Sequence, residues 1–255
     1  MNEREYDVMY AVEDRHWWYA ALHDLILGFV AREAAGGELA ILDAGCGTGR
    51  LGQLLKRYGR VEGCDISERA LAYCRERGIA AFPADLRSAD LGSRRYDVIT
   101  SIDVLYHRAI EDEAPVLSTL YQALKPGGLL ILNLVAHESL RSTHDIAVHT
   151  RRRYRRSDLL PLLEQAGFAV ERASYRLAFL FPPIACYRLG KRLFSPAGEP
   201  HEVRSDVRMP SPAVNGLLRW LTMAENRFIQ RHDLPFGTSL FAVARKPRSG
   251  QEDGP

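Results

Sequence analysis

Apolar residues follow two recurring patterns from residue 39 onward. Short, nearly uninterrupted apolar runs alternate with longer segments in which apolar residues recur every three or four positions. The first pattern is typical of buried strands and the second of helices that pack one face on a core. The runs predict strands at 39–45, 61–66, 79–85, 96–103, 129–135, 168–176 and 238–246, and the amphipathic segments predict helices at 50–58, 67–78, 111–125, 157–167 and 213–231. This alternation predicts an α/β fold with a seven-stranded, mainly parallel sheet covered by helices on both faces.

Capping residues mark the expected ends of these helices. Ser67 and Ser157 stand where an N-cap is needed, Gly78 and Gly167 where a helix should stop, and the Pro-Gly-Gly at 126–128 should end the helix over 111–125.

The chain divides into four expected parts. An amphipathic stretch at 15–33 precedes the first strand, so residues 1–38 are expected to form an N-terminal helical lid. Residues 39–176 form the core, and residues 177–236 interrupt the alternation and are expected to be a helical insertion on the substrate side. Residues 237–255 should hold the final strand and a disordered tail.

Composition narrows the class of protein. The chain has 255 residues, of which 46% are hydrophobic and 26% charged, with a net charge of +2. This is a globular mixture with too little charge to indicate nucleic-acid binding by itself, although cations gather between 151 and 192. Four cysteines without a C-x-x-C pair and a polar N-terminus predict a reduced, cytoplasmic protein.

The segment LDAGCGTGRLG carries the strongest signal. Asp43 ends a buried strand, and Gly45, Gly47 and Gly49 follow at alternate positions before a predicted helix. Such a turn lets a ligand approach the backbone at a helix N-terminus. Because Gly47, Gly49 and Gly52 also spell G-x-G-x-x-G, a dinucleotide loop remains an alternative.

Polar residues also end the next two strands. Asp65 ends the second strand, where a carboxylate can accept hydrogen bonds from ribose hydroxyls, and Asp85 with Leu86 ends the third, where they could hold an adenine. Open sheets bind ligands at this edge, so the pattern indicates a nucleoside site.

These motifs together resemble those of the class I S-adenosylmethionine-dependent methyltransferases. The resemblance covers residues 39–135 and rests on Leu42 to Gly49, Asp65, Ala84 to Leu86, Tyr96 to Val98 and Leu124 to Gly128. It implies a Rossmann-like fold, S-adenosylmethionine as cofactor and S-adenosylhomocysteine as product. The methionine part is expected at the glycine loop, the ribose at Asp65, the adenine at Asp85, and the methyl group near 101–103. The cofactor contacts expected on this basis are Asp43, Gly45, Cys46, Gly47, Asp65, Ile66, Asp85, Leu86, Ser101 and Trp18.

A more local resemblance is to bacterial methyltransferases, of the type 11/12 group, found with polysaccharide and natural-product genes. It rests on His16 to Tyr19, Asp103 to His107 and Ser142 to Tyr154. It implies an acceptor oxygen or nitrogen on a small molecule or a lipid- or glycan-linked group. Many such proteins have an arginine where this chain has Ala21 to His23.

Methyl transfer needs close positioning of the acceptor, exclusion of water and, for a protonated acceptor, a base. His107 is the favoured base because histidine titrates near neutral pH. Tyr106 could contact the acceptor or pack in the core, and His144 is a further catalytic candidate. The aromatic block at 16–19 is interpreted as a lid with Tyr19 on the acceptor, although burial in the core would also explain it.

The segment HDIAVHTRRRYRR, residues 144–156, has four interpretations. A metal site would need three or four ligands, and the two histidines, five residues apart, do not share a helical face. A nucleic-acid patch lacks a recognisable reading module. A solvated basic turn or a substrate loop fits better, and the substrate loop is favoured because the segment follows the fifth strand. We then expect a His144–Asp145 hydrogen bond, and acceptor contacts from His149, Arg152, Arg153 and Tyr154 to an anionic group.

The stretch at 177–194 combines an apolar run with Arg188, Lys191 and Arg192. It is too short to span a bilayer. We interpret it as a pocket wall, with a peripheral membrane contact as the alternative. The expected protein is a monomer or homodimer without metal or nucleic acid, and the alternatives to a methyltransferase are a nicotinamide-dependent oxidoreductase and a non-catalytic cofactor-binding accessory protein.

Overall fold

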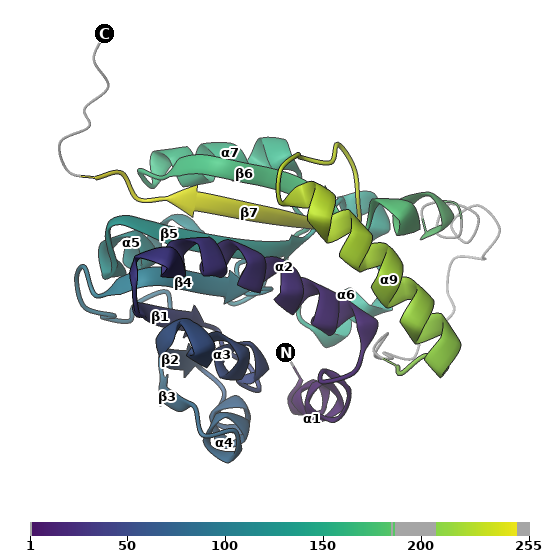
Figure 1. Ribbon diagram of the computed structural model, residues 1–255, viewed down its shortest axis with the longest axis horizontal. Coiled ribbons are helices and arrows are strands. Elements are labelled where there is room, and N and C mark those ends of the chain that lie inside the picture. Colours follow the sequence, from purple (N-terminus) through teal and green to yellow (C-terminus); the bar gives the residue numbers. More distant parts are fainter. Residues whose placement is uncertain (1, 185, 187–207, 249–255) are drawn as a thin grey trace, which may run out of the picture.

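The computed structural model describes residues 2–184, 186 and 208–248, which form one seven-stranded sheet (Figure 1). The strands are β1 (Leu39–Ala44), β2 (Gly59–Asp65), β3 (Ala80–Pro83), β4 (Tyr96–Ile102), β5 (Leu124–Val135), β6 (Ala169–Arg176) and β7 (Ser239–Arg245). Their order is β3-β2-β1-β4-β5-β7-β6, and β7 runs antiparallel to both of its neighbours while the other pairs are parallel. The predicted seven-stranded, mainly parallel sheet is confirmed.

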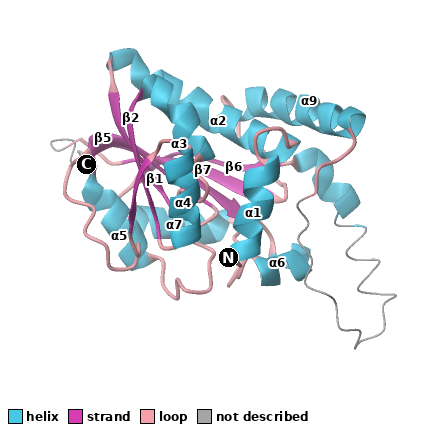
Figure 2. Ribbon diagram, turned by 90° about the horizontal axis from the view of Figure 1, so that it is seen from below, coloured by secondary structure: helices cyan, strands magenta, loops and turns pink. Residues whose placement is uncertain are grey.

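The helices also follow the predicted order. They are α1 (Glu3–Val12), α2 (Trp17–Glu33), α3 (Arg50–Leu55), α4 (Glu68–Glu76), α5 (Ala114–Ala123), α6 (Thr143–Ala147), α7 (Arg156–Gln165) and α9 (Pro212–Ile229). Two of them, α1 and α6, were not predicted. They lie close together, and the N–H of Asn2, before α1, donates to the carbonyl of Ala147 of α6 at 3.3 Å (Figure 2).

Two predicted helix ends were wrong. Helix α7 begins before Ser157: its N-cap is Arg155, whose N–H donates to Oδ2 of Asp158 at 2.9 Å. A carboxylate three residues along satisfies the cap more directly than the serine does. The Pro-Gly-Gly at 126–128 lies inside β5, because the chain becomes extended at Leu124, directly after α5.

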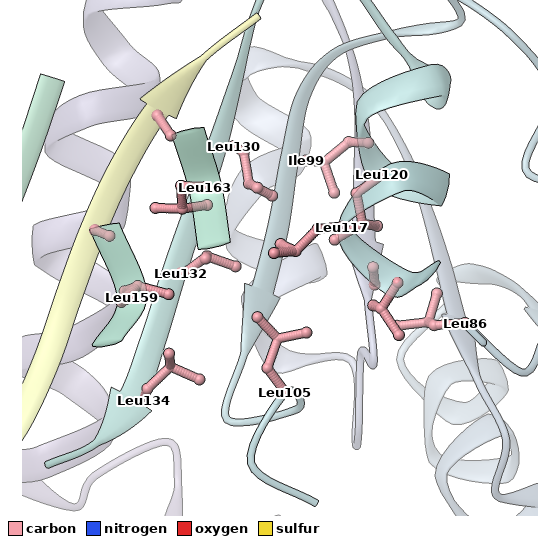
Figure 3. Close-up of a cluster of buried hydrophobic side chains, with 14 of the residues drawn as sticks. Leu86, Ile99, Leu105, Leu117, Leu120, Leu130, Leu132, Leu134, Leu159 and Leu163 are labelled. Atoms are coloured by element: carbon pink, nitrogen blue, oxygen red, sulfur yellow. The ribbon is translucent and has the colours of Figure 1, made fainter. Parts of the chain in front are cut away.

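Leucine side chains from helices and from strands fill the core on one face of the sheet. Leu117 and Leu120 of α5 and Leu159 and Leu163 of α7 pack against β4 and β5 (Figure 3). The opposite face is covered by α2, α3 and the end of α9. Both faces of the sheet are therefore buried, as a parallel sheet requires.

The carboxyl ends of β1, β2, β4 and β5 meet at one edge, where β7 begins. The strand order reverses between β1 and β4, the topological switch point at which open α/β sheets bind ligands. The predicted cations at 188–192 and the predicted tail at 250–255 lie outside the described residues. Within those residues, no helix is both long and apolar enough to cross a bilayer.

Candidate functional site

A cavity of about 610 Å³ opens along this edge of the sheet. Cofactor and substrate cavities usually lie between about 300 and 1,000 Å³. Its walls come from the ends of β1, β2, β4 and β5, the start of β7, helices α1 and α2, and the segment after β6. The cavity has room for a cofactor together with a small acceptor group.

The glycine loop forms one end of the cavity. Gly45, Gly47 and Gly49 all have left-handed backbone angles, with φ of 80°, 53° and 78°. A Cβ atom at residue 45 would lie 2.2 Å from Cγ2 of Val104. The loop is held by the N–H of Gly45, which donates to the carbonyl of Cys64 at 2.8 Å. Glycine is therefore required for both conformation and space.

Helix α1 lies against this loop. Oγ1 of Thr48 donates to Oε1 of Glu13 at 2.5 Å, and the same carboxylate pairs with Arg77 at 2.8 Å. Burial raises the pKa of Glu13 to about 7. Tyr6 and Met9 of α1 line the cavity. The sequence analysis missed α1, although Tyr6, Met9 and Glu13 recur at helical spacing.

Two carboxylates follow β2 and β3 in the cavity wall. Asp65 accepts hydrogen bonds from the N–H groups of Gly47 at 3.0 Å and Ser67 at 2.9 Å, so it braces the loop. Burial raises its pKa. Asp85 is paired with Arg87, whose guanidinium lowers the pKa of Asp85. Both lie in the lining where the ribose and adenine were expected.

The aromatic block at the start of α2 faces the cavity. Trp17, Trp18 and Tyr19 all line it, and the rings of Trp18 and Tyr19 meet edge to face with centroids 4.9 Å apart. His16 caps the helix, because its Nδ1 accepts the N–H of Trp18 at 3.3 Å. The neighbouring His23 also lines the cavity, and burial lowers its pKa to about 3, so it is neutral at pH 7.

Asp103 follows β4 and is held by a buried polar chain. Its N–H donates to the carbonyl of Asn133 at 2.9 Å, and Nδ2 of Asn133 donates to Oδ1 of Asp103 at 3.1 Å. Nη1 of Arg176, which is fully buried, donates to Oδ1 of Asn133 at 3.2 Å. These contacts hold Asp103 at a left-handed φ of 58°. Its second carboxylate oxygen has no hydrogen-bond partner among the described residues.

Burial raises the pKa of Asp103 to about 7, whereas the Asn133 hydrogen bond and the positive charges of Arg176 and Arg153 act to lower it. Burial also lowers the pKa of Arg176 to about 10, so this side chain remains cationic at neutral pH. Asp103 is thus a partly exposed carboxyl group in the cavity wall that can exchange a proton near pH 7.

His107 does not titrate where the sequence analysis expected. It lines the cavity, but burial lowers its pKa to about 4. Its Nδ1 accepts the N–H of Ala109 at 3.2 Å, which leaves the ring proton on Nε2. Tyr106 also lines the cavity, and burial raises its pKa, so its hydroxyl stays protonated. Both side chains are better suited to donate hydrogen bonds than to accept a proton.

Most arginines of the arginine-rich segment form ion pairs with carboxylates of the same protein. Arg151 and Arg152 both pair with the buried Glu113, and the hydroxyl of Tyr154 donates to the same carboxylate. Arg152 stacks over the ring of Tyr154 at 4.5 Å. Tyr154 is fully buried, so its assignment as an acceptor contact was wrong, and so was that of Arg152.

Three further residues that were predicted for the substrate side differ in their surroundings. Arg153 lines the cavity, but its guanidinium pairs with Asp145 at 2.8 Å. Asp145 also accepts the N–H of Ser142 at 2.7 Å, and the expected His144–Asp145 hydrogen bond involves a side chain outside the described part of the chain. His149 lies outside the lining and contacts Asn2 at 2.9 Å. The side chain of His144 lies outside what the structure describes.

Most expected cofactor contacts do lie in the cavity wall. These are Asp43, Gly45, Cys46, Gly47, Asp65, Ile66, Asp85, Leu86 and Trp18. Ser101 is the exception, since it is fully buried within β4 and absent from the lining. Leu177, Leu180 and Ile184 line the cavity too, as expected for a pocket wall. No group of three or more His, Cys, Asp or Glu side chains suited to a metal ion occurs in the described ranges.

Asn133 and Arg176 were missed by the sequence analysis. A signal existed, because Asn133 interrupts the apolar run LLILNLV, and a polar side chain inside a buried strand needs a hydrogen-bond partner. The sequence alone did not identify that partner.

Comparison with known proteins agrees with this geometry. Residues 41–128 match the model of a methyltransferase domain family. A probable S-adenosylmethionine-dependent methyltransferase of Mycolicibacterium smegmatis is 30% identical over 168 residues, which are 62% of each chain. The ubiquinone biosynthesis O-methyltransferase of Pseudomonas paraeruginosa is 28% identical over 135 residues, which are 47% of this chain and 57% of that protein. The chain thus spans about three fifths of the length of these relatives.

Among solved structures, an S-adenosylmethionine-dependent methyltransferase of Thermotoga maritima superposes with a TM-score of 0.58. The match covers 95% of both chains at 18% sequence identity. At that identity the likeness shows a shared fold and leaves the acceptor open.

Proposed function

We propose that the chain is a class I S-adenosylmethionine-dependent methyltransferase that transfers a methyl group to an oxygen or nitrogen of a small or lipid- or glycan-linked acceptor. The observation that supports this proposal is the composition of the cavity wall. The glycine loop and Asp65 line the same cavity as the aromatic residues of α2 and a second carboxylate, Asp103. The acceptor class accords with a role in natural-product or polysaccharide biosynthesis.

The residues present fit S-adenosylmethionine. The loop at 45–49 offers close backbone approach at the start of α3, where a Cβ atom at residue 45 would clash. Asp65 offers a carboxylate to ribose hydroxyls, and Leu86 an apolar surface to the adenine. When bound, this cofactor supplies the methyl group and leaves as S-adenosylhomocysteine.

Asp103 is the residue we assign to proton removal. Its side chain lines the cavity, and Oδ1 accepts a hydrogen bond from Nδ2 of Asn133 at 3.1 Å. It accepts the proton that an acceptor hydroxyl or amine loses as the new bond to carbon forms. A base whose pKa lies near the working pH is the most effective one.

His107 and Tyr106 are assigned to orientation of the acceptor. At neutral pH the Tyr106 hydroxyl is protonated and the His107 ring is neutral, and both side chains line the same cavity as Asp103. Trp17, Trp18 and Tyr19 exclude water from the reacting groups, which strengthens these hydrogen bonds.

Thermal denaturation with added ligands tests the proposal. S-adenosylmethionine and S-adenosylhomocysteine should raise the melting temperature because they bind only the folded chain, and NAD should not. Stabilisation by NAD alone would instead support an oxidoreductase. A screen of acceptors for methyl release follows, since tight cofactor binding without turnover would point to an accessory protein.

A further inference from the structure

The outward side of α9 carries a stripe of exposed apolar side chains. Of the eight large hydrophobic residues that are exposed in the described part of the chain, four lie on this helix. They are Val214, Leu217, Trp220 and Phe228, whose exposed fractions are 48%, 56%, 66% and 48%. Their spacing, completed by Ala224, places them on one side of the helix. Figure 1 shows α9 alongside α2 on the outside of the molecule.

The inward side of α9 is largely polar. Oδ1 of Asn215 accepts the N–H of Trp17 at 2.9 Å, and Nδ2 of Asn226 donates to the carbonyl of Ala21 at 2.7 Å. A surface helix normally turns its apolar side to the core and its polar side to water. Here hydrogen bonds attach the helix to α2, and much of its apolar surface is left outside. Exposed apolar surface of this kind marks an interaction site.

The charges around the stripe have one sign. Arg227 beside the stripe and Arg231 just after the helix are exposed, and neither has an ion-pair partner among the residues that the structure describes. Glu225 is the one carboxylate on α9, and its oxygens accept the N–H groups of Leu177 at 2.5 Å and Ala178 at 2.8 Å. The outward surface of α9 is thus apolar and cationic, with no acidic group of its own.

This combination of apolar and cationic side chains favours one kind of binding partner over another. A second copy of the same face would bring unpaired arginines together, with no carboxylate on the helix surface to offset them. A bilayer with anionic lipids offers an apolar interior to the stripe and phosphate groups to the arginines, and tryptophan is favoured at the boundary between the two.

We propose that α9 docks on an anionic phospholipid surface, with Leu217, Trp220 and Phe228 entering the headgroup region and the arginines contacting lipid phosphates. The helix is tied to the cavity at two places. Asn215 holds Trp17, and Glu225 caps the segment that starts at Leu177, and both Trp17 and Leu177 line the cavity. Docking therefore brings the cavity close to the bilayer, where a lipid-linked acceptor would be found. This last step rests on the proposed function, whereas docking itself does not.

Vesicle flotation of the full chain tests the proposal. The protein is mixed with phosphatidylcholine vesicles, or with vesicles that also contain phosphatidylglycerol, without cofactor or acceptor. We expect binding to the anionic vesicles at least about tenfold tighter than to the neutral ones, since each arginine near an anionic surface contributes about fivefold. Replacement of Leu217→Ser together with Trp220→Ser should weaken binding by about tenfold or more.

Matched variants control for stability and for general apolar contact. Ile146→Ser removes a side chain of similar exposure, 60%, from α6 and should leave vesicle binding unchanged. Arg227→Glu should weaken binding to anionic vesicles by about fivefold or more. Its control is Arg60→Glu, because Arg60 is exposed on β2, away from α9. Each variant should keep the wild-type affinity for S-adenosylmethionine in calorimetry, which shows that it is folded.

Three results would overturn the proposal: no binding to anionic vesicles, equal binding to both vesicle types, or undiminished binding by the Leu217 and Trp220 double variant. Light scattering supplies a fourth. A dimer that this double variant converts to a monomer would show that a second copy covers the stripe. Loss of cofactor binding by the wild type would count against the proposed function and would leave the vesicle result intact.

Discussion

The cofactor side and the acceptor side of the cavity are held together by different kinds of contact. On the cofactor side, residues 43–49 and 65–67 hold one another through short-range backbone geometry and hydrogen bonds, such as that from Gly47 to Asp65 at 3.0 Å. On the acceptor side, Asp103 is held by Asn133 and Arg176, which come from two other strands. The first side is encoded in a compact motif, and the second is assembled from distant positions. Changes should therefore act locally on the first side and propagate on the second.

Replacement of Asp103 should have the largest effect on turnover. Asp103→Asn keeps the size and the hydrogen bond to Asn133 but cannot accept a proton, so kcat should fall by about 100-fold or more. S-adenosylmethionine affinity, measured by calorimetry, should change by less than about threefold. Wild-type kcat/KM should rise with pH through a midpoint near 7, because the active form is the carboxylate, and the variant should lack that rise.

Kinetics with an acceptor from the methyl-release screen provide the measurement. Glu111→Gln, which changes an exposed carboxylate outside the cavity lining, is the control and should retain activity. A near-normal kcat in Asp103→Asn would show that the acceptor side needs no base and would remove the main chemical difference between the two sides.

Replacement of Asp65 should act on the cofactor alone. Asp65→Ala removes a ribose acceptor and also the brace on Gly47, so the dissociation constant of S-adenosylmethionine should rise by about 30-fold, or about 2 kcal/mol. Asp90→Ala is the matched control, because Asp90 accepts a backbone hydrogen bond from Gly92 outside the cavity lining. Unchanged affinity by calorimetry would refute the assignment of Asp65.

Replacement of Tyr154 should change stability rather than acceptor binding. Tyr154→Phe leaves the buried Glu113 without one of its hydrogen bonds, so the free energy of unfolding should fall by about 1–3 kcal/mol. Denaturant unfolding measures this, with the exposed Arg155→Ala as a control that should stay within about 0.5 kcal/mol of the wild type. A raised acceptor KM with normal stability would instead support a role of the arginine-rich segment in acceptor binding.

Much of the fold could be predicted, because strands and helices follow from local apolar spacing. The cofactor edge followed from motifs in which neighbouring residues do the work, as in the turn from Asp43 to Gly49, whereas the strand order came only from the structure. The missed helix α1 and the wrong cap at Ser157 depended instead on contacts that local propensity does not contain. Glu13 meets Thr48 and Arg77 only in the folded chain.

The arginine-rich segment shows where a prediction from local sequence differs from the tertiary structure. From its sequence, the run at 151–156 indicates a surface that meets an anion. In the structure, two buried carboxylates from other segments, Glu113 and Asp145, form ion pairs with arginines of this run. The sequence did not identify these partners. The same holds for α9, whose spacing predicted a helix but not which side faces the protein.

The sequence by itself determined the α/β fold, the glycine loop and the carboxylate after each strand on the cofactor side, because these depend on residues close together in the chain. Only the tertiary structure decided that Asp103 is held by Asn133, which Arg176 contacts in turn, and that burial lowers the pKa of His107. It also decided which arginines are committed to internal pairs. Each of these outcomes depends on burial and on partners that are dozens of residues away, and neither quantity is contained in local spacing.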